Sequence, residues 1–516
     1  MAAPQTIPEA LRRAAETFGD RPAYIEGDRT VTYTELLDRV ERTAEVFINN
    51  GACCGDRIVL WGPNSIDWAV TALAVTVAGG VLVPVNSRYV GHEVADVVRR
   101  TGAAAVVVHD GFLGRDQLAE LREAGVEQTP SSTPRLLSSL RDVVAAADRC
   151  EGQAHDGSLG PDSVADILFT SGTTGRSKGA MSSHAQTLGA AAAWAELGGV
   201  RADDRYLVVN PFFHSFGYKI GIIVGLLTGA TLYPVATFDV AETMRLIERE
   251  RITVFPGAPT LYQSMISSPD RAGIDLSSLR LAVTGAAVVP VVLIERMRAA
   301  APEGLDIDQV VTAFGMTEAV VVTMCREGDS AETVAGTCGR AIPGMETRID
   351  APQRSGDGSN EGELLVRGEF VMQGYLDDPE ATAQAIDADG WLHTGDVGRL
   401  DARGNLTITD RVKDMYICGG FNVYPAEIEQ ALARLDGVAD VAVIGVPDER
   451  MGEVGAAYVV RSPGATGEAL DESAVRAFAQ ERLANFKVPR AVRFVEALPR
   501  NLGGKVLKTD LREQWN

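Results

Sequence analysis

The chain has 516 residues, of which 46% are apolar and 23% charged, and its formal net charge is −22. This length predicts roughly two to four structural units rather than one core, and the composition is that of a globular enzyme rather than a disordered chain. The acidic balance excludes an extended nucleic-acid surface, because a phosphate backbone requires a basic footprint on the protein.

We expect neither a secretory signal at the start of the chain nor a spanning helix in its longest apolar run. The first twenty residues lack the apolar core of a secretory signal. The apolar run 70–85 is too short to span a bilayer and contains Gly79, Gly80 and Pro84. The six cysteines have no metal-like spacing, which indicates reduced thiols. We therefore expect a cytoplasmic protein that binds neither nucleic acid nor membrane.

The first 110 residues alternate between two periodicities. Apolar residues recur every three or four positions in 9–18 and 33–50, which predicts helices. The short apolar runs 56–62, 80–86 and 103–110 predict buried strands. This rhythm is typical of βαβ units and a parallel sheet. Residues 111–160 are less patterned, and we expect exposed loops there.

The same rhythm resumes from 164 to about 345. Further strands are predicted at 204–213, 229–235, 251–257, 279–287 and 306–315. Ligands of α/β sheets collect beyond the carboxyl ends of the strands. The strand ends at 284–287 and 314–318 are therefore candidate walls of a site.

The pattern becomes β-rich from 362 to 410, where Asp401–Gly404 predicts a hairpin turn. A further βα unit follows in 438–460 and 472–486. We therefore predict a large N-terminal domain, residues 1–411, and a smaller α+β C-terminal domain, residues 412–516.

The loop that follows the strand-like run 167–169 reads TSGTTGRSKG, residues 170–179. It differs from a Walker-type loop, because Gly172 and Gly175 are three apart and Gly179 follows Lys178. Its composition nevertheless suits a phosphate: glycine lets backbone N–H groups approach an anion, hydroxyls donate hydrogen bonds, and lysine supplies charge. Taken alone, the loop is also compatible with a flexible surface segment.

Lysine is scarce in this chain, with only six among 48 basic residues, at 178, 219, 413, 487, 505 and 508. A compact ammonium and a guanidinium fork bind ligands differently. Each remaining lysine is therefore a candidate for a specific role.

Six stretches together carry a resemblance to a known family. They are TSGTTGRSKG (170–179), AVTGAAVVP (282–290), AFGMTE (313–318), GWLHTGD (390–396), DRVKDMYICGGFNVYPAEIE (410–429) and PRNLGGKV (499–506). In this order they resemble the signatures of the adenylate-forming superfamily, which contains acyl-CoA synthetases, adenylation domains and luciferase. The resemblance covers nearly the full chain. It implies an α/β fold in which stacked βαβ sheets and a small β-barrel form the N-terminal domain and a mobile α+β lid forms the C-terminal one.

The resemblance implies ATP, Mg²⁺ and coenzyme A as reactants and cofactors of an acid–thiol ligase. A carboxylate is a poor electrophile, and attack on the α-phosphate of ATP converts it into a mixed anhydride with AMP as leaving group. Such chemistry needs charge neutralisation and positioning of the nucleotide. The residues implied to bind ATP and AMP are Thr170, Ser171, Gly172, Thr173, Thr174, Gly175, Lys178, Gly285, Ala286, Ala287, Phe314, Gly315, Thr317, Asp396 and Arg411.

Several of these residues have individual roles by the same resemblance. Glu318 would hold Mg²⁺, and Thr317 would reach the α-phosphate. Phe314 would stack on adenine, where the family usually has tyrosine, so a phenol hydroxyl is lost while stacking is kept. Asp396 would accept hydrogen bonds from the ribose hydroxyls, with Arg411 supporting the same sugar.

The C-terminal domain carries the remaining implied residues. Lys505 resembles the adenylation lysine, whose ammonium bridges the acyl carboxylate and α-phosphate. Lys413 matches the hinge of a lid that changes pose between the two half-reactions. In the second pose Gly419, Gly420 and Phe421 would line the path of the coenzyme A arm.

The acyl pocket is the least specific part of the resemblance. His214 resembles a histidine beside the acyl channel, although a packed core histidine is the plain alternative. The other implied lining residues are Phe213, Gly217, Ile222, Ala258, Met316 and Val321. Lys219 is the one basic residue in these segments, and no acidic residue stands ready for an amino group, which favours a largely apolar acid.

A finer likeness concerns the substrate. The stretches NPFFHSFGYK, LYQSM and LANFKVPR are similar to family members that activate the bicyclic propanoate left from the steroid C and D rings. We expect this small carboxylic acid as substrate, and a homodimer is a further expectation. Alternatives are a fatty-acyl or aromatic-acid CoA ligase, a stand-alone enzyme that loads a carrier protein, and a non-catalytic acyl-nucleotide binder. The last would lack Lys505 or Glu318, and both are present; an oxygenase activity stays open.

Replacement of the adenylation lysine separates the two half-reactions. We expect Lys505→Ala to abolish acid-dependent pyrophosphate release, because the ammonium that bridges carboxylate and phosphate is gone. Thioester formation from supplied acyl-adenylate should stay near the wild-type rate. Pyrophosphate release at the wild-type rate in this variant would refute the assignment.

Overall fold

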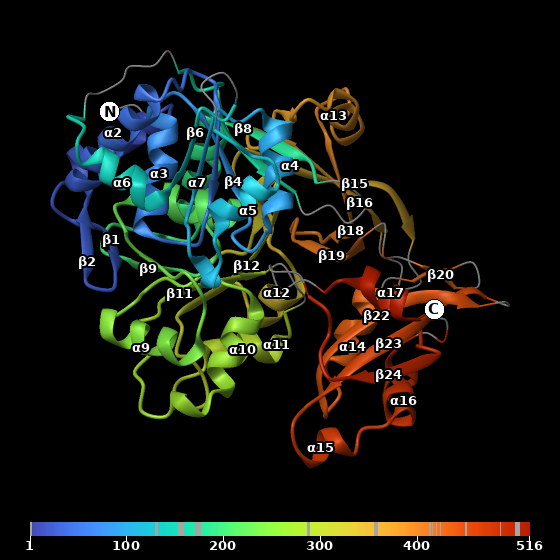
Figure 1. Ribbon diagram of the computed structural model, residues 1–516. Coiled ribbons are helices and arrows are strands. Elements are labelled where there is room, and N and C mark those ends of the chain that lie inside the picture. Colours follow the sequence, from blue (N-terminus) through green and yellow to red (C-terminus); the bar gives the residue numbers. More distant parts are fainter. Residues whose placement is uncertain are drawn as a thin grey trace.

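The computed structural model describes residues 3–128, 133–152, 159–170, 177–285, 289–354, 360–411, 414, 416–418, 421–423, 425–448, 451–483, 485, 487–500 and 506–515. Figure 1 shows a large body built from the first part of the chain and a smaller one, in orange and red, built from the last. The α/β fold with a large N-terminal and a smaller C-terminal part confirms the prediction from the sequence.

A seven-stranded sheet lies in the N-terminal part, with strand order β17-β8-β7-β4-β3-β5-β6. In this sheet, β4 pairs in parallel with β3 and β7, and β5 pairs in parallel with β3 and β6. Strand β8 is antiparallel to both β7 and β17. The strands are β3 (Arg57–Trp61), β4 (Val81–Val85), β5 (Ala105–Val108), β6 (Leu136–Ser139), β7 (Val164–Phe169), β8 (Gly179–Ser183) and β17 (Gly374–Tyr375).

A second sheet of the N-terminal part consists of two four-stranded halves, β2-β1-β10-β9 and β11-β12-β13-β14. Its strands are β1 (Pro22–Glu26), β2 (Arg29–Thr32), β9 (Arg205–Val208), β10 (Thr231–Pro234), β11 (Leu281–Gly285), β12 (Gln309–Met316), β13 (Ala319–Met324) and β14 (Arg340–Ala341). Val254 connects the halves, because it bridges in parallel to Tyr206 of β9 and to Leu281 of β11.

The strand predicted at 251–257 is therefore wrong in extent, since only Val254 pairs as a bridge. Helix α9 ends at Glu250, and Arg251 adopts a left-handed conformation. Pro256 has no N–H to donate towards β9, whereas Phe255 N and Gly257 N still donate to Leu281 O and Val283 O of β11, both at 2.9 Å. The segment still occupies a strand position between β9 and β11.

Both faces of the seven-stranded sheet are buried, which explains why its strands read as continuous apolar runs. Ile58, Leu60 and Leu82 face the main core, whereas Val59 and Val83 belong to a second core on the opposite face. The helices of this part are α1 (Ile7–Phe18), α2 (Tyr33–Asn49), α3 (Ile66–Val77), α4 (Gly91–Thr101), α5 (Gln117–Glu123), α6 (Leu140–Ala147), α7 (His184–Leu197), α8 (Val224–Thr228), α9 (Val240–Glu250), α10 (Pro259–Ser267), α11 (Val291–Arg298), α12 (Ala331–Gly336) and α13 (Pro379–Ala385).

Three short helices of other types complete the N-terminal part. Two are 3₁₀ turns, η1 (Phe112–Gly114) and η3 (Pro269–Arg271). The third, η2 (Phe216–Ile223), is a π-helix of eight residues, which continues directly into α8. π-helices are rare and are frequently found at functional sites, which makes this segment a candidate for a functional role.

The β-rich region forms an antiparallel sheet with strand order β15-β16-β18-β19. Its strands are β15 (Met345–Arg354), β16 (Asn360–Gly368), β18 (Leu392–Leu400) and β19 (Leu406–Arg411). The predicted hairpin turn at Asp401–Gly404 is confirmed, since Gly404 N donates to Asp401 O at 2.9 Å between β18 and β19.

The C-terminal part has its own sheet, ordered β21-β20-β23-β22 with β24 paired to β23. Its elements are β20 (Tyr416–Cys418), β21 (Phe421–Val423), α14 (Pro425–Leu432), β22 (Val438–Asp448), β23 (Gly452–Arg461), α15 (Ala465–Glu468), α16 (Glu472–Arg482), β24 (Ala491–Val495) and α17 (Lys508–Trp515). Its buried side chains, from Tyr416 to Leu511, form a hydrophobic cluster separate from those of the N-terminal part.

Two expectations from composition can be compared with the fold. Across the described residues, we find no helix with the length and apolarity needed to cross a membrane. All six cysteines carry free thiols, as their spacing predicted. Cys53 and Cys54 are exposed, whereas burial raises the pKa of Cys338 to about 12.

The packing of Tyr416 against β22 provides a test of the C-terminal core. A Cβ added at Gly445 would lie 2.3 Å from Cβ of Tyr416, so we expect Gly445→Ala to lower the free energy of unfolding by about 1–3 kcal/mol. Thermal and urea unfolding measure this. Gly336→Ala is the control, because no atom lies within 4 Å of its added Cβ. Equal stability of the two variants would contradict the packing described.

Candidate active site

The predicted phosphate loop begins where β7 ends. Thr170 N donates a hydrogen bond to Lys178 O at 2.8 Å, and Lys178 N donates to Thr170 Oγ1 at 3.3 Å. The two ends of the loop are therefore pinned together at the start of the antiparallel β7–β8 pair. The residues between them that were predicted to bind phosphate, Ser171, Gly172, Thr173, Thr174 and Gly175, lie outside the described residues.

Glu318 lies in a tight hairpin between β12 and β13. Met316 pairs with Ala319, so Thr317 and Glu318 form the two-residue turn, and a strand rather than a helix follows. Glu318 is 8% exposed, and its Oε1 accepts a hydrogen bond from Tyr375 Oη at 2.8 Å. Burial and the neighbouring Glu318 carboxylate raise the pKa of Tyr375, which keeps its hydroxyl a donor at neutral pH.

Tyr375 also contacts the phosphate-loop lysine. Lys178 Nζ lies 4.9 Å from the centre of the Tyr375 ring, within the range of a cation–π interaction. One side chain thus contacts both the lysine predicted to neutralise phosphate and the carboxylate predicted to hold Mg²⁺. The sequence motifs gave no reason to expect this contact.

The segment Val371–Tyr375 brings Lys178 and Glu318 to the same tyrosine, because it is hydrogen-bonded to strands of both sheets. Val371 bridges to Ala319, and Met372 N donates to Glu318 O at 2.8 Å, which joins the segment to β13. Gln373 N donates to Met181 O at 2.8 Å, and Tyr375 pairs with Ala180 of β8. The hairpin of Glu318 and the strand of Lys178 are therefore fixed relative to each other.

The predicted adenine wall lies at adjacent strand ends, as expected. β11 and β12 are parallel, with Gly285 opposite Ala313, and Phe314 follows half-buried. Gly285 and Gly315 are both required by the backbone, because an added Cβ would lie 2.8 Å from Ala313 O and 1.9 Å from Val320 O respectively. Ala286 and Ala287 lie outside the described residues.

The two predicted ribose residues occupy opposite positions in the sheet. Asp396 of β18 pairs with Arg411 of β19, and Asp396 is 5% exposed. The Arg411 backbone is described, but its side chain is not. Glu363 on the neighbouring β16 contacts two of the residues that precede Asp396. Its Oε1 accepts a hydrogen bond from Gly395 N at 3.0 Å, and its Oε2 lies 3.0 Å from His393 Nδ1. Gly395 has φ 69°, a conformation that glycine adopts without strain.

The predicted acyl residues Phe213 and His214 lie on a loop held by two asparagines. Asn64 accepts from Phe212 N at 2.7 Å and donates to the carbonyls of residues 208 and 210. Asn210 Nδ2 donates to Pro256 O at 2.9 Å, two residues before Ala258. The loop is thereby tied to the segment that begins α10.

The predicted acyl residues differ in accessibility. His214 is exposed, and its Nδ1 accepts a hydrogen bond from Phe216 N at 3.2 Å. Phe213, Ala258 and Met316 are partly exposed. Ile222 and Val321 are fully buried, at 0% and 1% exposure. Gly217 packs so closely that an added Cβ would lie 2.0 Å from Pro211 O.

Part of the predicted site cannot be placed. Lys413, Gly419, Gly420 and Lys505 lie outside the described residues. Phe421 opens β21, with its side chain not described. The roles of these residues in hinge motion, coenzyme A binding and adenylation stay predictions.

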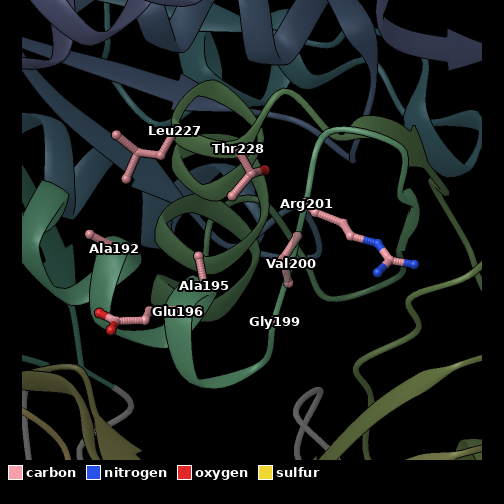
Figure 2. A pocket seen from close by; sticks show the side chains of 8 residues that line it. All are labelled: Ala192, Ala195, Glu196, Gly199, Val200, Arg201, Leu227 and Thr228. Atoms are coloured by element: carbon pink, nitrogen blue, oxygen red, sulfur yellow. The ribbon is translucent and has the colours of Figure 1, made fainter.

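A surface pocket of about 420 Å³ lies away from these motifs, between the ends of α7 and α8 (Figure 2). It is lined by Ala192, Ala195, Glu196, Gly199, Val200, Arg201, Leu227 and Thr228. The lining includes no residue of the predicted nucleotide or acyl sites.

The residues present fit a magnesium nucleotide. The described residues contain no group of three or more His, Cys, Asp or Glu side chains that could hold a metal ion by themselves. Mg²⁺ bound with a nucleotide needs only one or two carboxylates, since phosphate and water supply the remaining oxygens. Glu318 provides one carboxylate, which accepts from the Tyr375 hydroxyl, and the ammonium of Lys178 lies over the ring of the same tyrosine.

Three supporting residues were missed by the sequence reasoning. Tyr375, Glu363 and Asn64 lie between or beside the motifs, and no periodicity or spacing distinguishes them. Their contacts join segments that are well separated in the chain, by 57 positions for Tyr375 and Glu318 and by 148 for Asn64 and Phe212. The scarcity of lysine did indicate Lys219 as a candidate for a specific role.

Two family models match parts of the chain that contain several of these motifs. The AMP-binding enzyme family matches residues 11–376, and the AMP-binding enzyme C-terminal domain matches residues 427–505. The chain is 55% identical to the 3-[(3aS,4S,7aS)-7a-methyl-1,5-dioxo-octahydro-1H-inden-4-yl]propanoyl:CoA ligase of Rhodococcus jostii, over 99% of both chains. It is 53% identical to the ligase of the same name from Mycobacterium tuberculosis, again over 99% of both chains.

A solved structure gives the same result for the fold. ATP-bound MatB from Rhodopseudomonas palustris superposes with a TM-score of 0.86 at 31% identity, covering 99% of both chains. The chain therefore belongs to the AMP-binding enzymes of the adenylate-forming superfamily.

Proposed function

We propose that this chain is an ATP- and Mg²⁺-dependent acid:CoA ligase. It forms an acyl-adenylate and pyrophosphate, and then an acyl-CoA thioester and AMP. The acid is the bicyclic indenyl propanoate named for its relatives.

The observation that carries the activity is the contact of Tyr375 with both Lys178 and Glu318. It places an ammonium and a carboxylate at the carboxyl end of β7 and at the β12–β13 hairpin. A triphosphate needs positive charge at its outer phosphates and an oxygen ligand for its metal. When bound, Mg²⁺ neutralises the phosphate charge that develops as pyrophosphate leaves.

The residues of the chain divide the first half-reaction among them. Lys178 and the loop after Thr170 bind the β- and γ-phosphates, while Phe314 and Asp396 hold adenine and ribose. Thr317, next to Glu318 in the hairpin, donates to the α-phosphate. The acid oxygen attacks the α-phosphorus, the bond to the β-phosphate oxygen breaks, and Lys505 neutralises the charge between the reacting groups.

The second half-reaction uses the other motif of the C-terminal domain. A thiolate of coenzyme A attacks the acyl carbon, and AMP leaves. Gly419 and Gly420 let the pantetheine arm pass close to the backbone, and rotation about Lys413 exchanges them with Lys505. The division into residues 1–411 and 412–516 belongs to this proposal, as do a cytoplasmic location and a homodimer.

The acid is proposed from the names of two full-length relatives. An apolar site supports the same choice, because the accessible residues Phe213, Ala258 and Met316 carry no charge that an amino acid would require. A fatty or aromatic acid is the second candidate, since the same apolar lining accepts it. Formation of a thioester with free coenzyme A separates both candidates from an enzyme that loads a carrier protein.

A panel of acids tests the substrate. We expect pyrophosphate release, measured with ATP, Mg²⁺ and coenzyme A, to be fastest with the bicyclic propanoate among fatty acids, benzoates and amino acids. Mass spectrometry should detect its CoA thioester. Preference for a fatty or aromatic acid would keep the ligase chemistry and refute the proposed substrate.

Removal of one hydroxyl tests the position of Glu318. We expect Tyr375→Phe to raise KM for MgATP about fivefold, because one hydrogen bond that orients the carboxylate is worth roughly 1 kcal/mol. The Mg²⁺ concentration for half-maximal nucleotide binding should rise in parallel. Tyr24→Phe is the control, since its buried hydroxyl has no hydrogen-bond partner in the described part of the chain. An unchanged nucleotide affinity in Tyr375→Phe would show that the hydroxyl has no such role.

A further inference from the structure

One of the six lysines lies in the core of the N-terminal part. Lys219 is 1% exposed, and its Nζ lies 2.9 Å from Oδ1 of Asp166, which is fully buried. The other oxygen of Asp166 accepts from Thr187 Oγ1 at 2.7 Å. Burial lowers the pKa of Lys219, and the charge of Asp166 opposes that shift. This cluster connects β7, α7 and the π-helix η2.

The π-helix is held in place by few other polar contacts. Tyr206 Oη donates to Ile220 O at 3.0 Å from β9. Two further hydrogen bonds hold its start, from Phe216 N to His214 Nδ1 at 3.2 Å and from Tyr218 N to His214 O at 3.0 Å. Every residue from Gly217 to Ile223 is buried, and most of these residues are apolar. Rotation of this helix would separate the ammonium from the buried carboxylate, and a charge left unpaired in the core is strongly destabilising. The ion pair is therefore the contact in η2 most sensitive to its helical register.

The two ends of the ion pair are supported unequally. Asp166 lies in β7, which is hydrogen-bonded to β4 on one side and to β8 on the other. Lys219 lies in a helix that directly follows the loop of Phe213 and His214 and that belongs to no sheet. Loss of the pair will therefore move η2 and leave β7, with Thr170 at its end, in place.

A π-helix has a nearby alternative, because the ordinary α-helix is the more stable form for most sequences. Tyr218 N already donates to His214 O at 3.0 Å, the spacing of an α-helical turn just before the π-helix. Relaxation of Phe216–Ile223 to that pattern would rotate Gly217 and Ile222 relative to His214.

We propose that the Lys219–Asp166 ion pair fixes the π-helical register of Phe216–Ile223 and thereby the shape of the acyl site. Lys219 is a positioning residue that determines acyl specificity without contacting the acid. This inference rests on the proposed function in one respect, namely that His214, Gly217 and Ile222 belong to the acyl site.

The test is the double variant Lys219→Met/Asp166→Leu. Each single substitution leaves a buried charge unpaired and should lower Tm strongly, whereas removing both charges should restore most of it. In the double variant we expect the ratio of kcat/KM for the preferred acid over the second-best acid to fall about tenfold, the size of effect that a reshaped apolar pocket produces. KM for ATP should stay within about twofold, because the phosphate strand is not displaced.

A crystal structure of the double variant gives a readout that activity does not. We expect α-helical hydrogen bonds over residues 216–223 in place of the π-helical ones. Arg280→Met is the matched control, because it breaks the largely buried Arg280–Asp204 pair, whose residues directly precede the first residues of β11 and β9. It should lower Tm without changing the ratio between acids.

Two outcomes would overturn the inference. One is a folded double variant with the wild-type ratio, and the other is a retained π-helix in its structure. Should the double variant fail to fold, Lys219→Arg is the second variant, because it keeps the charge on a larger group. We expect it to lower the ratio between the acids by less than the double variant would. An unchanged ratio in Lys219→Arg would also overturn the inference. Failure of the proposed function is distinct, because the wild-type protein itself would then release no pyrophosphate with any acid.

Discussion

The candidate active site depends on one constraint, the hydrogen bonding of Val371–Tyr375 to both large sheets of the N-terminal part. Through this segment the β12–β13 hairpin and the β7–β8 pair become neighbours, although 140 positions separate Lys178 from Glu318 in the chain. Tyr375 then lies where it can contact both charges. Without the segment, the ammonium proposed for the phosphates and the carboxylate proposed for the metal would lie on separate sheets.

Much of the architecture follows from the sequence because its signals are local. The strand before Thr170 reads as an apolar run since both faces of its sheet are buried. The positions of Gly285 and Phe314 at neighbouring strand ends follow from the rule for parallel sheets. Asp396 and Arg411 were assigned to one sugar from two separate motifs, and the pairing of β18 with β19 places them opposite each other.

Other features could not be predicted because they depend on contacts between distant segments. Val254 occupies a strand position with a single bridge, and the sequence could not distinguish this from the full strand expected at 251–257. The contact of Tyr375 with Glu318 requires the pairing of a two-residue strand. Lys219 reads from the sequence as a charged residue in an apolar segment, and only the fold supplies the carboxylate that makes its burial possible.

The separate hydrophobic core of the C-terminal part has a consequence for motion. Among the described residues, its buried apolar side chains, from Tyr416 to Leu511, form a cluster distinct from the core of the sheets before them. A change in the position of this part would therefore leave both clusters of buried apolar side chains intact. A bound nucleotide or thiol would shift such an equilibrium by its difference in affinity for the two positions. The ligands themselves can thus select the arrangement, with no need for either core to open.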